Sequence, residues 1–120
     1  MDTEQIKKIA VAALEDIKGR DITVLDTRPL TSLFDAMIIA SGDSTRQVKA
    51  LADNVSEKLR EAGVEILGSE GEQGSEWVLV DAGDVVVHVM QPSVRQMYDL
   101  EALWGVAAKS AASHPRRTHA

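Results

Sequence analysis

The sequence predicts an α/β fold of the α+β kind, in which a single mixed β-sheet is flanked by helices in the order α-β-β-α-β-β-β-α. Two stretches, 3–18 and 44–62, have apolar residues at helical spacing, and five short apolar runs lie between and after them. The chain has 120 residues, of which 44% are hydrophobic and 27% charged. That length and composition are typical of one globular domain.

The first helix is predicted over residues 3–18. Its apolar positions follow the i, i+3, i+4 pattern of one buried stripe: Ile6, Ile9, Ala10, Ala13, Leu14 and Ile17. Asp2 or Thr3 can cap its start, and Gly19 stands where a glycine commonly follows a helix end. Ile22–Asp26 is predicted as a short first strand.

The middle of the chain predicts a buried strand followed directly by a second helix. Phe34–Ala40 is a nearly continuous apolar run, expected to be buried on both faces of the sheet. Ser44 and Gln47 fit a capping box, in which the two side chains satisfy backbone amides at the helix start. The buried stripe that follows consists of Val48, Leu51, Ala52, Val55, Leu59 and Ala62. Gly63 is expected to end this helix, and Val64–Leu67 to form the next strand.

Two valine-rich runs, Trp77–Val80 and Val85–Met90, predict a β-hairpin around the segment Asp81–Asp84. A two-residue loop of Ala82 and Gly83 suits a type I′ turn poorly, because Ala82 resists positive φ. A type I turn with Gly83 in a bulge would shift the pairing by one residue and mix the two faces. The two-residue loop is the preferred interpretation, because it gives one face made only of valines.

In the preferred register the two faces of the hairpin differ in character. The first face is expected to lie in the core and carries Val78, Val80, Val85, Val87 and Val89. The second face carries Trp77, Leu79, Asp81, Asp84, Val86, His88 and Met90. Asp81 and Asp84 would lie opposite each other there, which is unfavourable unless water or a cation serves them. Because this face is half apolar and half acidic, we interpret it as a docking surface, with two solvated turn aspartates as the alternative.

Three segments complete the organisation. Gly68–Ser75 holds three glycines and two glutamates, which predicts a mobile surface loop. Pro92 suits the first turn of a short helix that carries Tyr98. A second apolar cluster follows it and consists of Leu100, Leu103 and Trp104. The domain is expected to span residues 1–105, and the small, basic tail 106–120 is expected to be disordered.

The charge distribution predicts a basic protein as partner. The net charge is −6, residues 1–105 hold all 19 acids but only 10 of the 13 bases, and Lys and Arg are absent between Arg60 and Arg95. An acidic surface repels phosphate backbones, and few aromatic side chains are present to stack on bases, so no direct nucleic-acid recognition is expected. Complementary potentials favour a basic protein surface, with an acidic face kept for solubility as the alternative.

The sequence also predicts where the protein works. It contains no apolar run near the roughly 20 residues that span a bilayer, and its start lacks the features of a signal peptide. It has no cysteine and therefore no disulfide framework and no thiolate ligand. We expect a cytoplasmic protein without membrane contact.

No set of residues predicts catalysis. The turn Ser41–Ser44 lies between a strand and a helix, but it lacks the glycine spacing of a phosphate loop, and Asp43 would repel an anion; helix capping is the alternative. Glu70 and Glu72 form a close acidic pair, but they lie in the predicted loop. His88 could act as a general base, or it could make a hydrogen bond or an interface contact. We therefore expect no catalytic residue, no cofactor and no metal site.

A longer signature combines these features. It consists of Trp77–Met90 followed by Gln91, Arg95, Tyr98, Asp99, Leu100, Leu103 and Trp104, preceded by Asp35–Ile39, Ser41-Gly42, Ser44, Arg46–Val48, Ala52-Asp53 and Glu70–Glu72. With this signature the chain resembles the ribosomal silencing factor family, also called the Iojap family, over about residues 3–104. Asp43 stands where the family more often has Thr or Asn, and Gln47 where it often has His.

The resemblance implies a nucleotidyltransferase-like fold that lacks the paired strand aspartates on which those enzymes hold metal. It implies binding to the large ribosomal subunit through its protein fourteen, beside the intersubunit face. There a family member sterically prevents the small subunit from joining, which lowers translation when nutrients are scarce and catalyses no reaction. The resemblance also implies a homodimer when the protein is free.

The expected partner-binding residues lie on or near the second hairpin face: Glu70, Trp77, Asp81, Asp84, His88, Met90 and Tyr98. Trp77 and Met90 would form an apolar centre with Tyr98 at its edge, and the acidic residues would meet basic side chains. Two other functions stay open at this point. One is a nucleotidyltransferase-like nucleotide-binding protein that uses the turn Ser41–Ser44, and the other is a dimeric adaptor for another basic protein.

Overall fold

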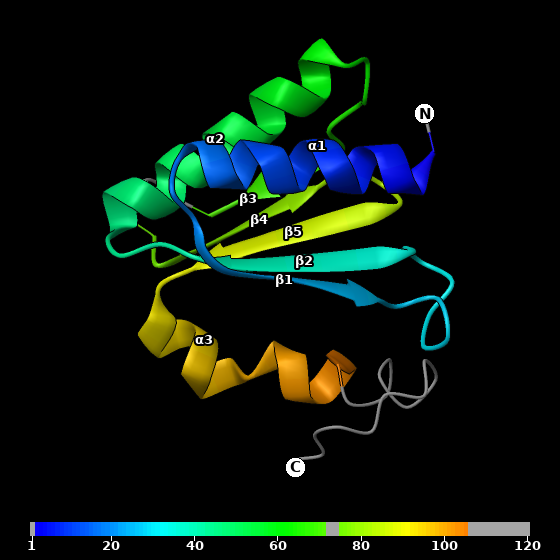
Figure 1. Cartoon of the computed structure of the whole chain (residues 1–120). Coiled ribbons are helices and arrows are strands. Elements are labelled where there is room, and N and C mark those ends of the chain that lie inside the picture. The colour runs from blue at the N-terminus through cyan, green and yellow to red at the C-terminus, as the bar shows by residue number, and fades with distance from the viewer. Residues whose placement is uncertain (1, 72–74, 106–120) are drawn as a thin grey trace.

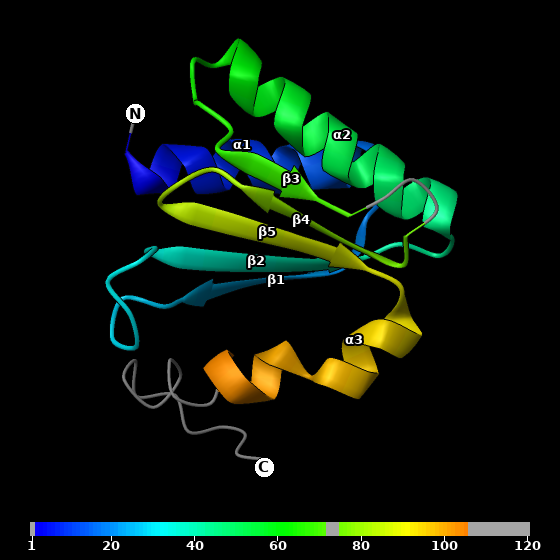
Figure 2. The same ribbon diagram turned by 180° about the vertical axis from the view of Figure 1, so that it is seen from behind.

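The computed structural model describes residues 2–71 and 75–105, which form a five-stranded sheet with helices on both faces (Figure 1, Figure 2). In chain order the elements are α1 (Thr3–Asp16), β1 (Arg20–Asp26), β2 (Ala36–Ser41), α2 (Thr45–Glu61), β3 (Gly68–Glu70), β4 (Trp77–Asp81), β5 (Val85–Met90), α3 (Pro92–Tyr98) and the π-helical turn η1 (Glu101–Gly105). The strands lie in the order β1-β2-β5-β4-β3, with β2 and β5 parallel and the other neighbours antiparallel. The predicted mixed sheet and the predicted order of elements are confirmed.

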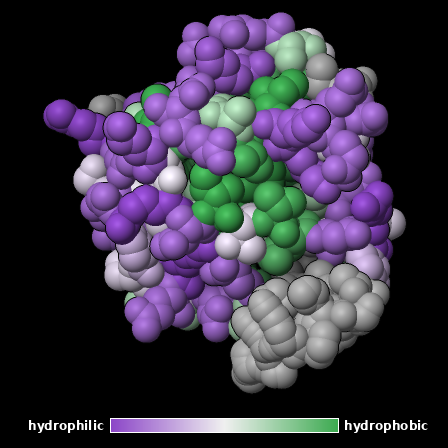
Figure 3. Space-filling model, viewed as in Figure 1, coloured by the Kyte–Doolittle hydropathy of each residue, from purple (hydrophilic) through white to green (hydrophobic). Residues whose placement is uncertain are grey.

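The two faces of the sheet are covered by different layers. In both ribbon views α1 and α2 lie together across one face, and α3 and η1 lie against the other (Figure 1, Figure 2). The larger core, between the sheet and α1–α2, includes the fully buried side chains of Leu14, Ile38 and Leu51. Every residue of β2 is buried, which confirms the predicted cover on both faces, but the strand begins at Ala36 and not at Phe34. Where Figure 3 shows the surface in the same view, apolar side chains gather over the region of α1 and the edge strand β1, and polar side chains surround them.

Local hydrogen bonds fix both ends of α1. Asp2 is the N-cap: its carboxylate accepts from the Gln5 amide at 2.9 Å, and Gln5 Oε1 accepts from the Asp2 amide at 3.1 Å. At the other end Lys18, and not Gly19, takes the left-handed conformation, with a φ of 63°. The prediction that Gly19 ends the helix is therefore wrong by one residue. Glycine is needed at position 19 for another reason, since a Cβ there would lie 3.0 Å from the Leu14 carbonyl oxygen.

The capping box predicted at the start of α2 forms only in half. Ser44 Oγ accepts from the Gln47 amide at 3.1 Å, but Gln47 Oε1 accepts from the amide of Asp43 and not from that of Ser44. The Gln47 side-chain amide also donates to the carbonyl oxygens of Ile17 and Lys18, at 3.1 and 3.2 Å. Gln47 therefore joins the end of α1 to the start of α2.

The third strand lies later in the chain than predicted. Gly63 ends α2, as expected, with a φ of 90°. The next amide, of Val64, donates back to Leu59 in the last turn of α2 at 2.9 Å. The predicted strand Val64–Leu67 does not form: only the Leu67 amide reaches β4, where it donates to the Asp81 carbonyl oxygen, and β3 begins at Gly68. The loop predicted over Gly68–Ser75 is accordingly a strand at its start, and the middle of that segment lies outside the described residues.

The hairpin β4–β5 turns one residue later than in the preferred register, at Gly83-Asp84. The Ala82 amide donates to the Val85 carbonyl oxygen at 2.9 Å, which closes the two-residue loop. Gly83 has a φ of 87°, as the first loop position of a type II′ turn requires. Placing glycine there spares Ala82 the positive φ that it would resist.

This shift changes the cross-strand partners but not the two faces. Asp81 pairs with Val86, so the expectation that Asp81 lies opposite Asp84 is wrong. Each residue of β4 pairs two positions later on β5 than expected, and side chains on a strand alternate with a period of two. Side chains that were expected to share a face therefore still do. The valine face is confirmed as core: Val78, Val80, Val85, Val87 and Val89 are all buried beside α1 and α2.

Candidate partner-binding site

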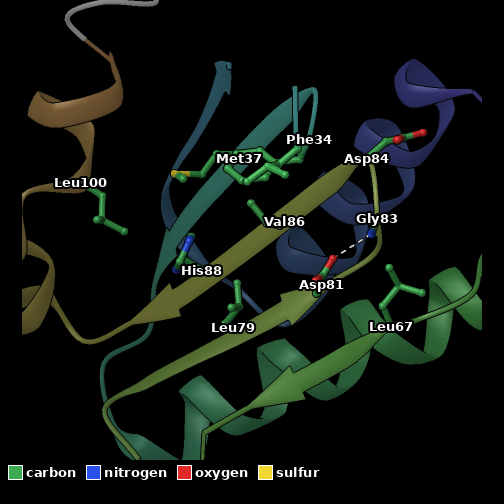
Figure 4. Close-up of a pocket in the computed structure, with 11 residues that line it drawn as sticks. Phe34, Met37, Leu67, Leu79, Asp81, Gly83, Asp84, Val86, His88 and Leu100 are labelled. Carbon is green, nitrogen blue, oxygen red and sulfur yellow. Dashed lines mark hydrogen bonds between the residues drawn. The ribbon is translucent and has the colours of Figure 1, made fainter. Parts of the chain in front are cut away.

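A groove of about 710 Å³ opens along β5 and β4 on the α3 side of the sheet (Figure 4). Strands β2, β4 and β5 form its floor, and the segments before β2, before β3 and after α3 form its walls. The residues that line it are Leu33, Phe34, Met37, Leu67, Leu79, Asp81, Gly83, Asp84, Val86, His88 and Leu100. The groove therefore coincides with the second hairpin face, and its lining has the mixed apolar and acidic character expected of that face.

A short helical cover leaves this face open. α1 and α2 have 14 and 17 residues, whereas α3 has only 7, so the α3 side is covered over part of its length. Met37 and Val86, which pair across β2 and β5, are buried in the floor. Leu33 and Leu67, at the rim, are 81% and 61% exposed. Apolar side chains that gather at a concave surface in this way mark binding sites.

Two aspartates of the hairpin turn lie in the groove lining. Asp81 Oδ1 accepts from the Gly83 amide at 2.9 Å, a bond marked in Figure 4. The backbone oxygen of Asp84 accepts from the amides of Asp35 and Ala36 at 2.7 and 3.1 Å. These bonds hold the turn through the Asp84 backbone, and the Asp84 side chain is exposed to solvent.

Trp77, His88 and Tyr98 form an aromatic cluster beside the groove. Trp77 Nε1 donates to His88 Nδ1 at 2.9 Å, and the ring centroids of Trp77 and Tyr98 lie 4.9 Å apart. Burial of the imidazole lowers the pKa of His88 to about 4, so the ring is neutral at pH 7. Trp77 and His88 also line a second hollow of about 330 Å³ with Leu79 and Gly71. The cluster therefore continues the second hairpin face beyond the main groove.

Arg95 holds α3 and η1 against the sheet. The helix begins at Pro92, as predicted. The Arg95 guanidinium donates to both carboxylate oxygens of Glu101 at 2.8 Å, to Ser41 Oγ at 2.9 Å and to Thr23 Oγ1 at 3.0 Å. Because Thr23 and Ser41 belong to β1 and β2, one side chain connects two strands with the helical cover and so fixes the wall of the groove.

Most of the predicted partner-binding residues come together at this face. Five of the seven lie in or beside the groove: Trp77, Asp81, Asp84, His88 and Tyr98. Met90 does not offer a surface, because it is fully buried in the cluster that includes Val94 of α3. The backbone of Glu70 belongs to β3, and the Glu70 and Trp104 side chains and the tail 106–120 lie outside the described part.

Sequence reasoning missed the walls of the groove. Phe34 and Met37 belong to the run predicted as a buried strand, and Leu33 to the connection before it. The sheet order brings this segment beside β5, more than forty positions later in the chain. The signal that could have found the rim is a large apolar side chain, such as Leu33 or Leu67, outside any helical stripe.

The turn Ser41–Ser44 serves as a helix cap. Ser44 Oγ accepts from the Gln47 amide, and the Asp43 amide donates to Gln47 Oε1, so these polar groups are engaged within the chain. Across residues 2–71 and 75–105, no three His, Cys, Asp or Glu side chains lie close enough together to hold a metal ion. Within the same two ranges, no helix has the length and apolar character needed to cross a membrane.

Known proteins share both the sequence and the fold. A family model described as "Ribosomal silencing factor during starvation" matches residues 1–120. The chain is 68% identical over 105 residues to the ribosomal silencing factor RsfS of Chromobacterium violaceum, an alignment that covers 88% of this chain and 86% of that protein. A mouse protein named mitochondrial assembly of ribosomal large subunit protein 1 is 33% identical over 97 residues, which covers 78% of this chain and 42% of the mouse protein.

The similarity extends to a solved structure. A crystal structure of a protein from Chromobacterium violaceum matches with a TM-score of 0.86 and 68% identity, and the match covers 88% of each chain. Fold, sequence and family model thus agree over nearly the whole described region. The chain belongs to the ribosomal silencing factor family, whose members regulate ribosomes and are not enzymes.

Proposed function

We propose that this protein binds the large ribosomal subunit through the subunit's protein fourteen and sterically blocks joining of the small subunit. Translation would then be repressed under nutrient limitation, in the cytoplasm where the subunits meet. Family membership supports the ribosome as partner, and the name of the mouse relative, which refers to the large subunit, supports the choice of subunit. The observation that carries the docking face is the apolar groove with aspartates in its lining.

The charge of this face suits a ribosomal protein. Asp81 and Asp84 lie in the groove lining, and no Lys or Arg occurs in the sequence between Arg60 and Arg95, which includes β3, β4 and β5. Proteins that bind ribosomal RNA carry basic surfaces to neutralise phosphates. Attraction between that basic surface and the aspartates would steer the encounter and set its orientation.

The apolar part of the face supplies anchors. Trp77 and Tyr98 lie against each other beside the groove, and Tyr98 is 57% exposed. Aromatic residues dominate the binding energy of many interfaces, because they bury a large area in a rigid geometry. Leu79 lies between this aromatic pair and the turn aspartates, in both hollows, and Met90 supports them from within the core.

The direct test is co-sedimentation with separated large and small ribosomal subunits at two salt concentrations. An Asp81→Asn/Asp84→Lys variant tests the acidic end, and asparagine at position 81 keeps an acceptor for the Gly83 amide. Glu57→Lys, a charge reversal at an exposed position on α2, is the control on the opposite face. We expect salt-sensitive binding to the large subunit that the double variant loses and the control keeps. A wild type that binds neither subunit, or a double variant that binds normally, would contradict the proposal.

The aromatic anchor has its own test. Trp77→Ala should weaken binding to the large subunit by about 2 kcal/mol or more, if Trp77 is a principal contact. Circular dichroism and a urea titration would establish that the variant is folded. Normal binding by a folded Trp77→Ala variant would remove Trp77 from the interface.

We also propose that the free protein is a homodimer in which a second copy covers the groove. The exposed rim leucines give the reason, since apolar surface at a concave site favours association. Leu33→Asp should shift the protein to a monomer in sedimentation equilibrium. A wild type that stays monomeric at tens of micromolar would refute the dimer and leave ribosome binding untouched.

A further inference from the structure

The hydrogen bond between Trp77 and His88 determines which nitrogen of the imidazole carries the proton. The indole Nε1–H of Trp77 can only donate, so His88 Nδ1, 2.9 Å away, must accept with its lone pair. A neutral imidazole that accepts at Nδ1 carries its hydrogen on Nε2. The pair therefore leaves His88 with a single donor, Nε2–H, on the side of the ring away from Nδ1.

The docking face is where this donor would be used. His88 lines both the main groove and the smaller hollow beside Trp77, and Figure 4 shows its ring in the groove between Leu79 and Leu100. Within residues 2–71 and 75–105, the hydrogen bond of the His88 ring is the one from Trp77. Most of the neighbouring lining is apolar and offers no acceptor. A partner that filled the groove without an acceptor would leave the Nε2–H buried and unsatisfied, which disfavours binding.

The surroundings also decide which kind of acceptor fits. A Lys or Arg head group has only donors, so it cannot pair with Nε2–H. A carboxylate would be buried against a neutral ring in a groove that already carries Asp81 and Asp84. A carbonyl oxygen, from the main chain or from an Asn or Gln side chain, meets neither objection.

We propose that His88 is a specificity-determining donor of the docking groove, and that Trp77 is a positioning residue that directs its Nε2–H toward a carbonyl oxygen of the bound protein. This inference rests on the proposed function for the identity of the partner. It divides the groove into two recognition points. The turn aspartates bind a basic side chain of the partner, and His88 donates a hydrogen bond to a neutral acceptor of the partner. A basic protein surface that lacks a correctly placed carbonyl is thereby rejected.

The tautomer is tested on the free protein, without ribosomes. Nitrogen-resolved NMR of the His88 ring should show Nδ1 unprotonated and Nε2 protonated at pH 7. Trp77→Phe keeps an aromatic ring beside Tyr98 but removes the indole donor, so His88 should then exchange between its two tautomers. An Nδ1–H tautomer in the wild type, or a tautomer unchanged in Trp77→Phe, would overturn the positioning role of Trp77.

The donor is tested by two amide substitutions that differ by one methylene group. In His88→Asn the side-chain oxygen can still accept from Trp77, but no donor reaches the Nε2 position. In His88→Gln the longer amide can place an N–H there. We expect large-subunit affinity to fall about tenfold or more in His88→Asn and within about threefold of wild type in His88→Gln, with both variants folded by circular dichroism.

The outcomes separate this inference from the function on which it rests. Equal affinity of wild type and His88→Asn would overturn the donor role while subunit binding stood. Equal losses in His88→Asn and His88→Gln would show that shape, and not the donor, matters at this position. A wild type that does not bind the large subunit would contradict the proposed ribosomal partner. The NMR experiment would still decide the tautomer of His88, because it uses the free protein.

Discussion

The two faces of the sheet use neighbouring residues of the same strands for opposite purposes. Ile38 and Val87 pair across β2 and β5 and are fully buried under α1 and α2. The next pair along the strands, Ile39 and His88, turns to the other face, where His88 reaches the groove. The first face has a long helical cover and only aliphatic side chains at its centre, whereas the second has a short cover and a mixture of aromatic, acidic and apolar groups. Alternate residues of one strand therefore contribute to the covered core and to the candidate site.

The largest expected effect comes from a substitution on the sheet face that α1 and α2 cover. Leu51 is fully buried between α2 and the sheet, so Leu51→Ala should lower the free energy of unfolding by about 3 kcal/mol in a urea titration. Leu79, in the groove, is only partly buried, and Leu79→Ala should cost about 1 kcal/mol of stability while it weakens binding to the large subunit. Similar losses of stability at both positions would mean that the groove face is core as well.

A second variant weakens the attachment of α3 and η1 to the groove side of the sheet. Arg95→Ala removes the hydrogen bonds to Glu101, Ser41 and Thr23 and should lower the free energy of unfolding by about 2 kcal/mol. Amide hydrogen exchange should show faster opening of α3 than of α2. The exposed pair Lys49–Asp53 on α2 supplies the control, since Lys49→Ala should cost less than about 0.5 kcal/mol. Equal effects of the two substitutions would show that Arg95 is not what holds the cover.

The smallest expected effect concerns pH. Burial lowers the pKa of His88 from 6.5 to about 4, so between these values the unfolded state binds a proton that the folded state does not. His88 therefore costs no stability above pH 6.5, and it destabilises the fold progressively as the pH falls toward 4. At about pH 5.5 the expected loss is about 1.4 kcal/mol. The measurement is the free energy of unfolding as a function of pH for wild type and for His88→Gln. The difference between the two curves removes the contribution of the carboxylates, because both proteins contain them. A flat difference would mean that the imidazole titrates alike in both states.

Patterns carried by neighbouring residues predicted much of the fold. The apolar stripe before Gly63 and the cap at Ser44 identified α2, because helix ends are decided by hydrogen bonds within a few residues. The valine face of the hairpin followed from strand alternation alone. The register of the hairpin could not be predicted in this way. It depends on whether the loop begins at Ala82 or at Gly83, which takes the positive φ, and the pattern of apolar residues is the same for both loops.

The candidate site was predictable only along the hairpin that carries it. Asp81, Asp84 and His88 lie on one strand pair, so alternation placed them together. Phe34 and Leu67 reach the same groove from segments whose position depends on the whole sheet order. The burial of Met90 likewise depends on α3 turning back over the end of β5, which no local periodicity records.

The parallel pairing of β2 with β5 also constrains how the chain acquires its shape. Ala36 pairs with Val85 and Ser41 with Met90, so the centre of the sheet is assembled from segments that lie far apart in the chain. Contacts of such long sequence separation form late, because the intervening chain must be ordered before they are gained. During synthesis β2 must therefore wait, with Ile38 and Ile39 uncovered on at least one edge, until the hairpin emerges. A chain interrupted before Val85 could still pair β2 with β1, but the other edge of β2 would stay unpaired and the chain would be prone to aggregation.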